Sequence, residues 1–499
     1  MNNIKLFYAS LNKEGKSAKA GEIRANLEET GVKEQHITNP RVLTPGKVTL
    51  VSGDKAPGED LDPQVFSYYL RENDEKVPRI LLAKHHPVGM DPKNPGEPAA
   101  RFVVFKPVSE TSDWIAANAD GQANDFGYAW PGITNLRGVA QLNASHIFLL
   151  GLDGTKIYHV STSALDSGSA DSPEVLIDLA ETLPEVTGFV PKGVRLIALE
   201  DHLFVLHAYV ADPYDPAKGY ADGKITRIPV NFSGDGPPEA GTPEVLDVGK
   251  NPSGLAAVLD GKFVKLFVPC VGGNLAPGSA NGPDSKLLVV DFKKKTVATA
   301  YAGVAGEAGK DLDAATVRLN FYGVALNQSG SGLYLLNLAR DKKGTGFFWR
   351  LYKTTASNVL AVADKTIDDL ETDAKLLDHT PENPDKAGDP GILWNIIYEN
   401  ASQRLWFLRG DAVQVTEGAS YPPAPGDKPS NASDRRYLTA GKLYGTDAAI
   451  LVSADLAGET LYGSSRRQAQ ASNIVFTKDA AHHPVPAVGA EAIATADNA

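Results

Sequence analysis

The chain has 499 residues, of which 42% are hydrophobic and 22% charged, and its formal net charge at pH 7 is −12. This composition is typical of a globular protein and unlike that of a disordered chain. The acidic excess argues against a nucleic-acid surface or a site for anionic membranes, since both need clustered Lys and Arg. The sequence contains no apolar segment of 18 residues, so it predicts no membrane-spanning helix.

The N-terminal region is expected to contain a short helix. Ser17–Gly31 is rich in good helix formers, begins with a Ser suited to the N-cap and ends with a Gly, which together predict a short N-terminal helix. The residues before it lack the charged region, apolar core and cleavage site of a secretory signal. The chain nevertheless has only two methionines and one cysteine, which suits an oxidising compartment. We therefore expect a periplasmic or extracellular location, with the cytoplasm as the alternative.

Short strands separated by turn residues fill the chain from about residue 80 onward. They begin with Ile80–Ala83 and Arg101–Lys106. Two comparable series follow, and their predicted strands are 137–142, 146–150 and 156–160, then 194–199, 202–207 and 224–228. Turns are expected at Asp153-Gly154 and Asp222-Gly223. Each series leads to the same tetrapeptide, Pro-Glu-Val-Leu, at positions 173 and 243, a spacing of 70.

Further units follow the same order up to the C-terminal region. Their predicted strands are 322–326, 333–338, 347–352, 392–398, 404–408, 412–415, 449–452 and 474–477. The first strands of successive units are marked by Gly138, Val194, Gly254, Gly323 and Trp394, at steps of 56, 60, 69 and 71 residues. Four short strands per step of this size are typical of a β-propeller blade. The sequence therefore predicts an all-β propeller of about seven four-stranded blades, with six and eight as alternatives.

The clearest unit is Asn251–Gly303, in which three apolar runs are separated by turn residues. It has Asn251-Pro252, Gly254-Leu255-Ala256, Asp260-Gly261-Lys262, Leu266-Phe267-Val268, Val289-Val290-Asp291 and Lys295–Thr299. In these residues it resembles the YVTN-type β-propeller repeat, but Phe267-Val268-Pro269-Cys270 stands where that family has Tyr-Val-Thr-Asn. The resemblance implies a seven-bladed propeller and no particular activity, since such propellers include binding proteins, cell-surface proteins and some enzymes.

A ring of blades has to close on itself, because open sheet edges invite pairing with other chains. We expect Ile4–Ala9 or Lys47–Val51 to close it by pairing with Ile474–Thr477. Residues 1–484 are then one propeller domain, and residues 485–499, which are small, polar and without periodicity, are a flexible tail. Ala361–Leu377 is expected to insert a second short helix between strands.

The motifs that would carry chemistry are incomplete. Gly15-Lys16-Ser17 lacks the preceding Gly of a phosphate-binding loop, and the sequence has no Gly-x-Ser-x-Gly elbow. The pairs His85-His86 and His482-His483 have no Cys or carboxylate at ligand spacing, so we predict no metal there. Cys270 lies in an apolar run and is expected to be a buried small hydrophobe. The run Lys293–Lys295 is expected to be a solvated hairpin turn.

One group of polar residues is a candidate ligand site. Arg137 precedes the first strand of one unit, while His207 and Asp212 end the second strand of another. They supply a cation, a titratable group and an anion, which a pocket needs among apolar walls. We predict that all three approach the mouth of the central channel. Asp212, Asp215 and Asp222 also form a possible Ca²⁺ site, although the closing Glu of a calcium loop is absent, so no cofactor is predicted.

The sequence thus favours a non-enzymatic binding or scaffolding module that acts through its loop-rich face. Its partner is a protein or small molecule of unknown identity. Long loops at 212–222, 272–284 and 421–434 would build that face. Two alternatives stay open: a propeller enzyme, similar to a lactonase or a cofactor-dependent dehydrogenase with a metal or quinone in the channel, and a subunit of a cell-surface assembly.

Overall fold

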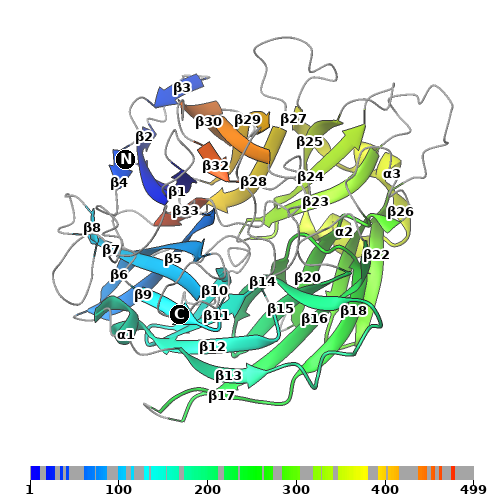
Figure 1. The fold of residues 1–499 in the computed structure, drawn as a ribbon. Coiled ribbons are helices and arrows are strands. Elements are labelled where there is room, and N and C mark those ends of the chain that lie inside the picture. The colour runs from blue at the N-terminus through cyan, green and yellow to red at the C-terminus, as the bar shows by residue number, and fades with distance from the viewer. Residues whose placement is uncertain are drawn as a thin grey trace.

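The computed structural model shows an all-β molecule in which small antiparallel sheets surround a common centre (Figure 1). The structure describes residues 2–11, 18–27, 34–37, 41–43, 61–72, 75–86, 99–107, 114–116, 128–133, 136–152, 154–167, 173–211, 219–233, 236–260, 263–273, 284–303, 318–327, 329–340, 347–379, 392–399, 403–414, 436–446, 451–455, 460–462 and 474–477.

Five separate sheets form blades of a propeller, and we number them in chain order. The first contains β5 (Leu61–Glu72), β6 (Glu75–His86), β7 (Ala99–Pro107), β8 (Trp114–Ala116) and β9 (Tyr128–Pro131). The second contains β10 (Leu136–Asn143), β11 (His146–Gly151), β12 (Lys156–Ser161) and β13 (Glu174–Asp178). The third contains β14 (Val190–Leu199), β15 (His202–Val210), β16 (Tyr220–Asn231), β17 (Glu239–Ala240) and β18 (Glu244–Lys250).

A short strand from the connection within the fifth blade pairs with the edge of the fourth blade. The fourth contains β19 (Ala256–Asp260), β20 (Phe263–Cys270), β21 (Lys286–Asp291), β22 (Thr296–Ala302) and, paired in parallel with β22, β26 (Lys365–Thr366). The fifth contains β23 (Arg318–Leu326), β24 (Leu333–Arg340), β25 (Phe347–Thr354) and β27 (Lys375–His379). Because β26 lies in the connection from β25 to β27, the fifth blade adds an edge strand to the fourth.

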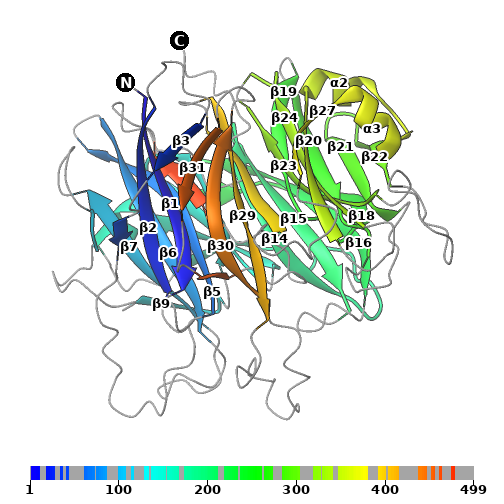
Figure 2. The same ribbon diagram turned by 90° about the horizontal axis from the view of Figure 1, so that it is seen from above.

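A ten-stranded sheet holds strands from both ends of the chain. It contains β28 (Ile392–Glu399), β29 (Arg404–Gln414), β30 (Arg436–Thr446), β31 (Leu451–Asp455), β32 (Thr460–Tyr462), β33 (Ile474–Thr477), β1 (Asn2–Leu11), β2 (Ala18–Leu27), β3 (Glu34–Ile37) and β4 (Arg41–Leu43). Viewed from above, β1, β2, β29 and β30 run through the thickness of the molecule (Figure 2). β1 pairs with β33 from Lys5 opposite Thr477 to Tyr8 opposite Ile474. The predicted closure by Ile4–Ala9 is therefore confirmed, and Lys47–Val51 lies outside the described residues.

Successive sheets pack face to face, and each hydrophobic cluster contains side chains of two neighbours. Phe66 of the first blade shares a cluster with Ile147 of the second, and Phe148 of the second shares one with Val205 of the third. The third and fourth blades, the fourth and fifth, and the fifth with β28 and β29 pack in the same way. The apolar residues on both sides of a strand are therefore buried, which explains the nearly continuous apolar runs in the sequence.

The predicted repeat matches the blades closely. The markers Gly138, Val194, Gly323 and Trp394 lie on β10, β14, β23 and β28, the strands near the centre of Figure 1. The two Pro-Glu-Val-Leu segments lead into β13 and β18, which are both outer strands. The structure shows a propeller arrangement with five separate blades; it does not confirm the predicted number of seven.

Some local predictions are wrong. Asp222-Gly223 is not a turn but lies within β16, at a shift in its pairing with β15 and β18. A Cβ at Gly223 would lie 2.6 Å from the carbonyl oxygen of His207, so this glycine allows two strands to approach. The segment at 412–414 continues β29 and is not a separate strand.

The predicted N-terminal helix is also wrong, because Ala18–Leu27 is strand β2. It pairs with β1 over all ten of its residues. From Glu22 to Leu27 the sequence alternates polar and apolar residues, the period of a strand. Pairing with a neighbouring strand therefore outweighs the helix propensity of these residues.

Three short helices are described: α1 (Thr162–Ser167), α2 (Ala356–Ala361) and α3 (Ile367–Asp373). The last lies within Ala361–Leu377, where a helix was predicted. The helices in the described part of the chain have six or seven residues each, and none of them is long and apolar enough to cross a membrane. The predicted division into residues 1–484 and a tail stays a prediction, since 478–499 lie outside the described residues.

We expect the β1–β33 pairing to hold the ring closed. Leu6 pairs with Ile23 on one side and Phe476 on the other, so Leu6→Pro removes a ladder hydrogen bond and should cost on the order of 2–3 kcal/mol. Among the described residues Asn2 pairs only with Leu27, so Asn2→Pro is the matched control. Urea unfolding should show a large decrease in the free energy of unfolding for Leu6→Pro and little change for Asn2→Pro. Equal losses in the two variants would contradict this role of β1.

Candidate functional site

In the second and fifth blades, the connection between the third and fourth strands covers the blade before it. In the second blade this connection begins with α1, whose Asp166 forms an ion pair with the Arg79 guanidinium of the first blade. In the fifth blade it contains α2 and α3, whose Val359, Ile367 and Leu370 pack against the fourth blade. The helices α2 and α3 lie at the edge of the molecule beside β22 and β26 (Figure 1). At these two junctions a helix fills the space between blades.

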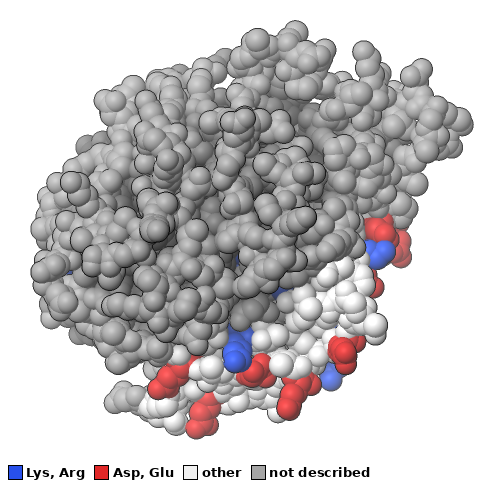
Figure 3. Space-filling model, in the orientation of Figure 1, with Lys and Arg blue, Asp and Glu red and all other residues white. Residues whose placement is uncertain are grey.

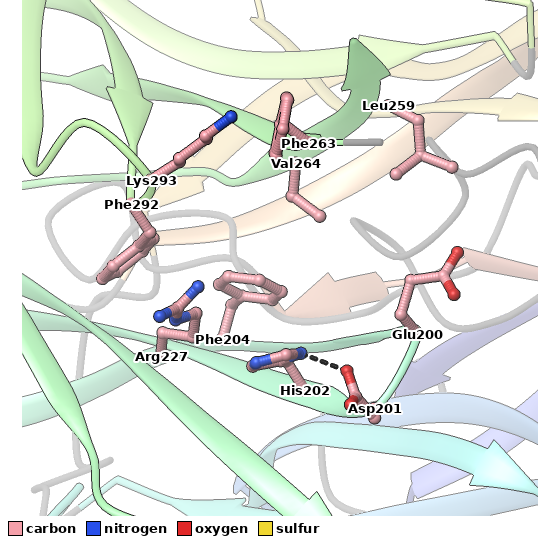
Figure 4. A pocket seen from close by; sticks show the side chains of 10 residues that line it. All are labelled: Glu200, Asp201, His202, Phe204, Arg227, Leu259, Phe263, Val264, Phe292 and Lys293. Carbon is pink, nitrogen blue, oxygen red and sulfur yellow. Dashed lines mark ion pairs between the residues drawn. The ribbon is translucent and has the colours of Figure 1, made fainter. Parts of the chain in front are cut away.

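The junction between the third and fourth blades has no such helix, because β21 and β22 are joined by a four-residue turn, 292–295. Lys295 in this turn has φ of 53°. A pocket of about 450 Å³ opens there. Figure 4 shows its lining, which comes from the β14–β15 turn, β15, β16, the β19–β20 hairpin and the β21–β22 turn: Glu200, Asp201, His202, Phe204, Arg227, Leu259, Phe263, Val264, Phe292 and Lys293.

Apolar side chains form much of the pocket. The Phe204 and Phe292 rings lie 5.8 Å apart between centroids and are tilted by 51°, and both side chains are almost completely buried. Phe263, the first residue of β20, leaves 41% of its surface exposed. The open side of this pocket therefore presents an aromatic ring to solvent.

Two cations lie against these rings on one side of the pocket. The Lys293 Nζ lies 3.3 Å from the centroid of Phe263, and the Arg227 guanidinium lies 5.4 Å from that of Phe292. Both distances are within the range of a cation–π interaction. Arg227 also donates to a Glu244 carboxylate oxygen at 2.7 Å. Lys293 takes part in none of the ion pairs found among the described residues.

Two acidic residues occupy the other side, to the right in Figure 4. Glu200 and Asp201 form the β14–β15 turn, and Glu200 has the left-handed φ of 54°. The Asp201 carboxylate contacts the Nδ1 atom of His202. The pocket therefore has acidic groups at one end and basic groups at the other.

The sequence pointed to a different site, and the structure places its members as follows. Arg137 lies on β10, an innermost strand, and is 3% exposed. His207 lies on β15 and is fully buried. Asp212 and Asp215 lie outside the described residues, and Asp222 is exposed on β16. Whether Arg137, His207 and Asp212 bind a ligand stays a prediction.

His207 joins two blades. Its Nε2–H donates to the carbonyl oxygen of Gly154 in the second blade, at 2.7 Å. Gly154 has φ of 74°, and a Cβ there would lie 2.3 Å from the backbone nitrogen of Gly193. The backbones of the two blades therefore meet at this point. Burial lowers the pKa of His207 to about 4, because a buried imidazolium loses its hydration. The His207 side chain is thus neutral at pH 7 and links the two blades through its hydrogen bond.

The junction of the second and third blades also contains a counterpart of the pocket residues. His146 begins β11 as His202 begins β15, and its Nδ1 lies 2.8 Å from His159 Nε2. Phe232 follows β16 directly, as Phe292 follows β21, and its ring centroid lies 5.2 Å from that of His146. Burial, followed by the proximity of His146, lowers the pKa of His159 to about 4. Here Phe232 and the histidine pair occupy the position that corresponds to the pocket.

Sequence reasoning missed the pocket because its residues come from five separate segments. It treated Lys293 as part of a solvated turn; the turn is confirmed, but Lys293 lies over Phe263. One signal was visible: His146 and Phe148, like His202 and Phe204, stand two residues apart at the start of a second strand. This repeat marks positions at the junctions between blades.

Cys270 is fully buried, as expected, and burial raises the pKa of its thiol to about 12. No group of three or more His, Cys, Asp or Glu side chains able to hold a metal ion occurs within the described residues. In the view of Figure 3, the described surface carries scattered acidic and basic side chains and no continuous basic area.

No protein-family model matches the chain, and no curated protein matches it. Among solved structures it is similar to the crystal structure of a protein from Lactobacillus plantarum, with 8% sequence identity and a TM-score of 0.35, over 83% of this chain and 99% of that chain. A likeness of this size assigns no function. The blade arrangement of the sheets supports the resemblance of Asn251–Gly303 to the YVTN-type repeat as far as the propeller fold and no further.

His207 should make stability depend on pH. The unfolded chain binds its proton near the ordinary pKa of 6.5 and the folded chain near 4, so the unfolded state holds more protons between these values. The stabilisation from neutral His207 is complete above pH 6.5 and decreases by up to about 3 kcal/mol as the pH falls to 4. The free energy of unfolding, measured in urea at several pH values across this range, should depend less steeply on pH in His207→Gln than in the native protein. An unchanged pH dependence would contradict the role assigned to His207.

Proposed function

We propose that this chain is a β-propeller binding protein that holds a small, partly apolar ligand between its third and fourth blades. The observation that supports this most is the open pocket between the third and fourth blades, where β21 and β22 are joined by a four-residue turn. A cavity of about 450 Å³ with apolar walls and a few convergent polar groups is typical of small-molecule sites. The exposed Phe263 ring in its lining can contact a ligand without any opening of the fold.

The proposed site lies at the face formed by the first-to-second and third-to-fourth strand turns. The strand ends joined by the loops 212–222 and 272–284 lie at the opposite face, because neighbouring strands in a blade are antiparallel. The proposal therefore moves binding away from the long loops that the sequence favoured. The proposed role is still non-enzymatic binding, but the binding surface is the face with the pocket and not the loop-rich face.

The proposal includes seven blades. In the ten-stranded sheet, β28–β31 form one run, and β33, β1, β2 and β4 form another, with β32 between β30 and β1. Taken as two blades, these runs complete a ring in which the last blade combines strands of both termini. A propeller with this closure needs both ends of the chain to fold.

We also propose a periplasmic or extracellular location. The low number of oxidisable side chains supports it: two methionines in the whole chain and one cysteine, which is buried. Fractionation of the cells that produce the protein tests this location, and recovery in the cytosolic fraction contradicts it.

Phe263→Ala should abolish most ligand binding and leave the fold intact. The ring is the exposed wall of the pocket, so its loss should weaken the binding of naphthalene-sized probes roughly tenfold. Val175→Ala on β13 is the control, because Val175 is similarly exposed, at 49%, and lies in another blade away from the pocket. Binding is measured by the fluorescence of 2-naphthalenemethanol and 2-naphthoate titrated with each protein.

The expected result is saturable binding by the native protein and by Val175→Ala, with a clear loss in Phe263→Ala. Equal binding by all three proteins would place the probe elsewhere and contradict the proposed site. Circular dichroism of each variant confirms that the β-structure is retained.

A further inference from the structure

The charges around the pocket point to the chemical class of its ligand. We propose that the pocket takes an amphipathic organic anion: a flat apolar body carrying one carboxylate, with the acid group at the end formed by Lys293 and Arg227. This inference rests on the proposed function and adds the sign of the ligand's charge and its orientation.

The basic end has more cations than carboxylates to balance them. The Glu244 carboxylate contacts Arg227 at 2.7 Å and Lys295 at 3.8 Å, so one acid serves two bases. Lys293 lies beside this group with its ammonium over the Phe263 ring and forms no ion pair within the described residues. In a chain with a net charge of −12, this end of the pocket is locally positive and complementary to an anion.

The aromatic rings favour a flat ligand body. Phe204, Phe263 and Phe292 present ring faces or edges from three different strands or turns, and aromatic pairs gain energy beyond simple burial when offset or tilted. Leu259 and Val264 add aliphatic surface. A fused bicyclic ring or a short branched chain would fill this space and cover Phe263.

The cations already held by the rings argue against a positively charged ligand. Asp201 already contacts His202, and two of the aromatic rings already hold cations, Lys293 and Arg227. A cationic ligand would meet these two bases at the same rings that would have to bind it. A carboxylate near Glu200 would be repelled, so the ligand is oriented with its acid toward Lys293.

Three naphthalenes of one shape separate charge from apolar fit: 2-naphthoate, 2-naphthalenemethanol and 2-naphthylmethylamine. They are titrated into the native full-length chain and into Lys293→Gln by isothermal calorimetry in 20 mM and 300 mM salt. Lys294→Gln is the matched control, because Lys294 lies in the same turn, is exposed and does not line the pocket. Both substitutions remove one positive charge, so the overall field of the protein changes equally.

We expect the carboxylate to bind about fivefold or more tightly than the alcohol, and the amine to bind most weakly. Lys293→Gln should remove most of the preference for the carboxylate over the alcohol, while Lys294→Gln should keep that preference. The preference should shrink in 300 mM salt, since ions screen partly exposed charges.

The outcomes distinguish this inference from the proposed function. If the alcohol or the amine binds as tightly as the carboxylate, or if Lys293→Gln keeps the preference, the charge assignment is overturned while the binding function stands. If none of the three compounds binds the native protein, the proposed function fails and this inference fails with it.

Discussion

A strand that is apolar on both sides has to be covered on both sides, and this constraint shapes the whole molecule. The second to fifth blades each pack one face on the blade before and the other on the sheet after, as the shared clusters show. The same constraint requires the ring to close, because a terminal blade would expose one face. The pairing of β1 with β33 meets that requirement by joining the two ends of the chain.

The junctions between blades differ mainly in what fills their outer part. A helix does so after β12 and after β25, and the histidine pair beneath Phe232 does so between the second and third blades. After β21 the chain turns back within four residues. The pocket is therefore a consequence of one short connection in a repeated architecture. The same turn also supplies one of its charged residues, Lys293, while Arg227, Glu200 and Asp201 come from the third blade.

The repeat could be predicted because it is local: apolar runs of strand length separated by turn residues identify β10 to β12, β14 to β16 and β19 to β22 with small errors. The number of blades was harder, because the strands of both termini pair within one sheet. The N-terminal strand β2 was missed since its alternation covers only six residues among good helix formers. Asp222-Gly223 shows a further limit, because the same dipeptide suits a turn or a close approach between strands.

The site was beyond sequence reasoning for a related reason. Arg137 and His207 attracted attention as polar residues near strand ends, yet the structure shows both buried, and His207 bonded to the neighbouring blade. A buried polar residue in a strand looks the same in sequence whether it holds blades together or binds a ligand. The pocket residues stand far apart in the chain, and only the packing of two blades brings Phe204, Phe263 and Phe292 together.

The most direct test of this account is a crystal structure of the protein with 2-naphthoate bound. The account predicts electron density for the ring among Phe204, Phe263 and Phe292, with the carboxylate within hydrogen-bond distance of Lys293. Density for the compound in the central channel beside Arg137, with the pocket between the third and fourth blades unchanged, would contradict it.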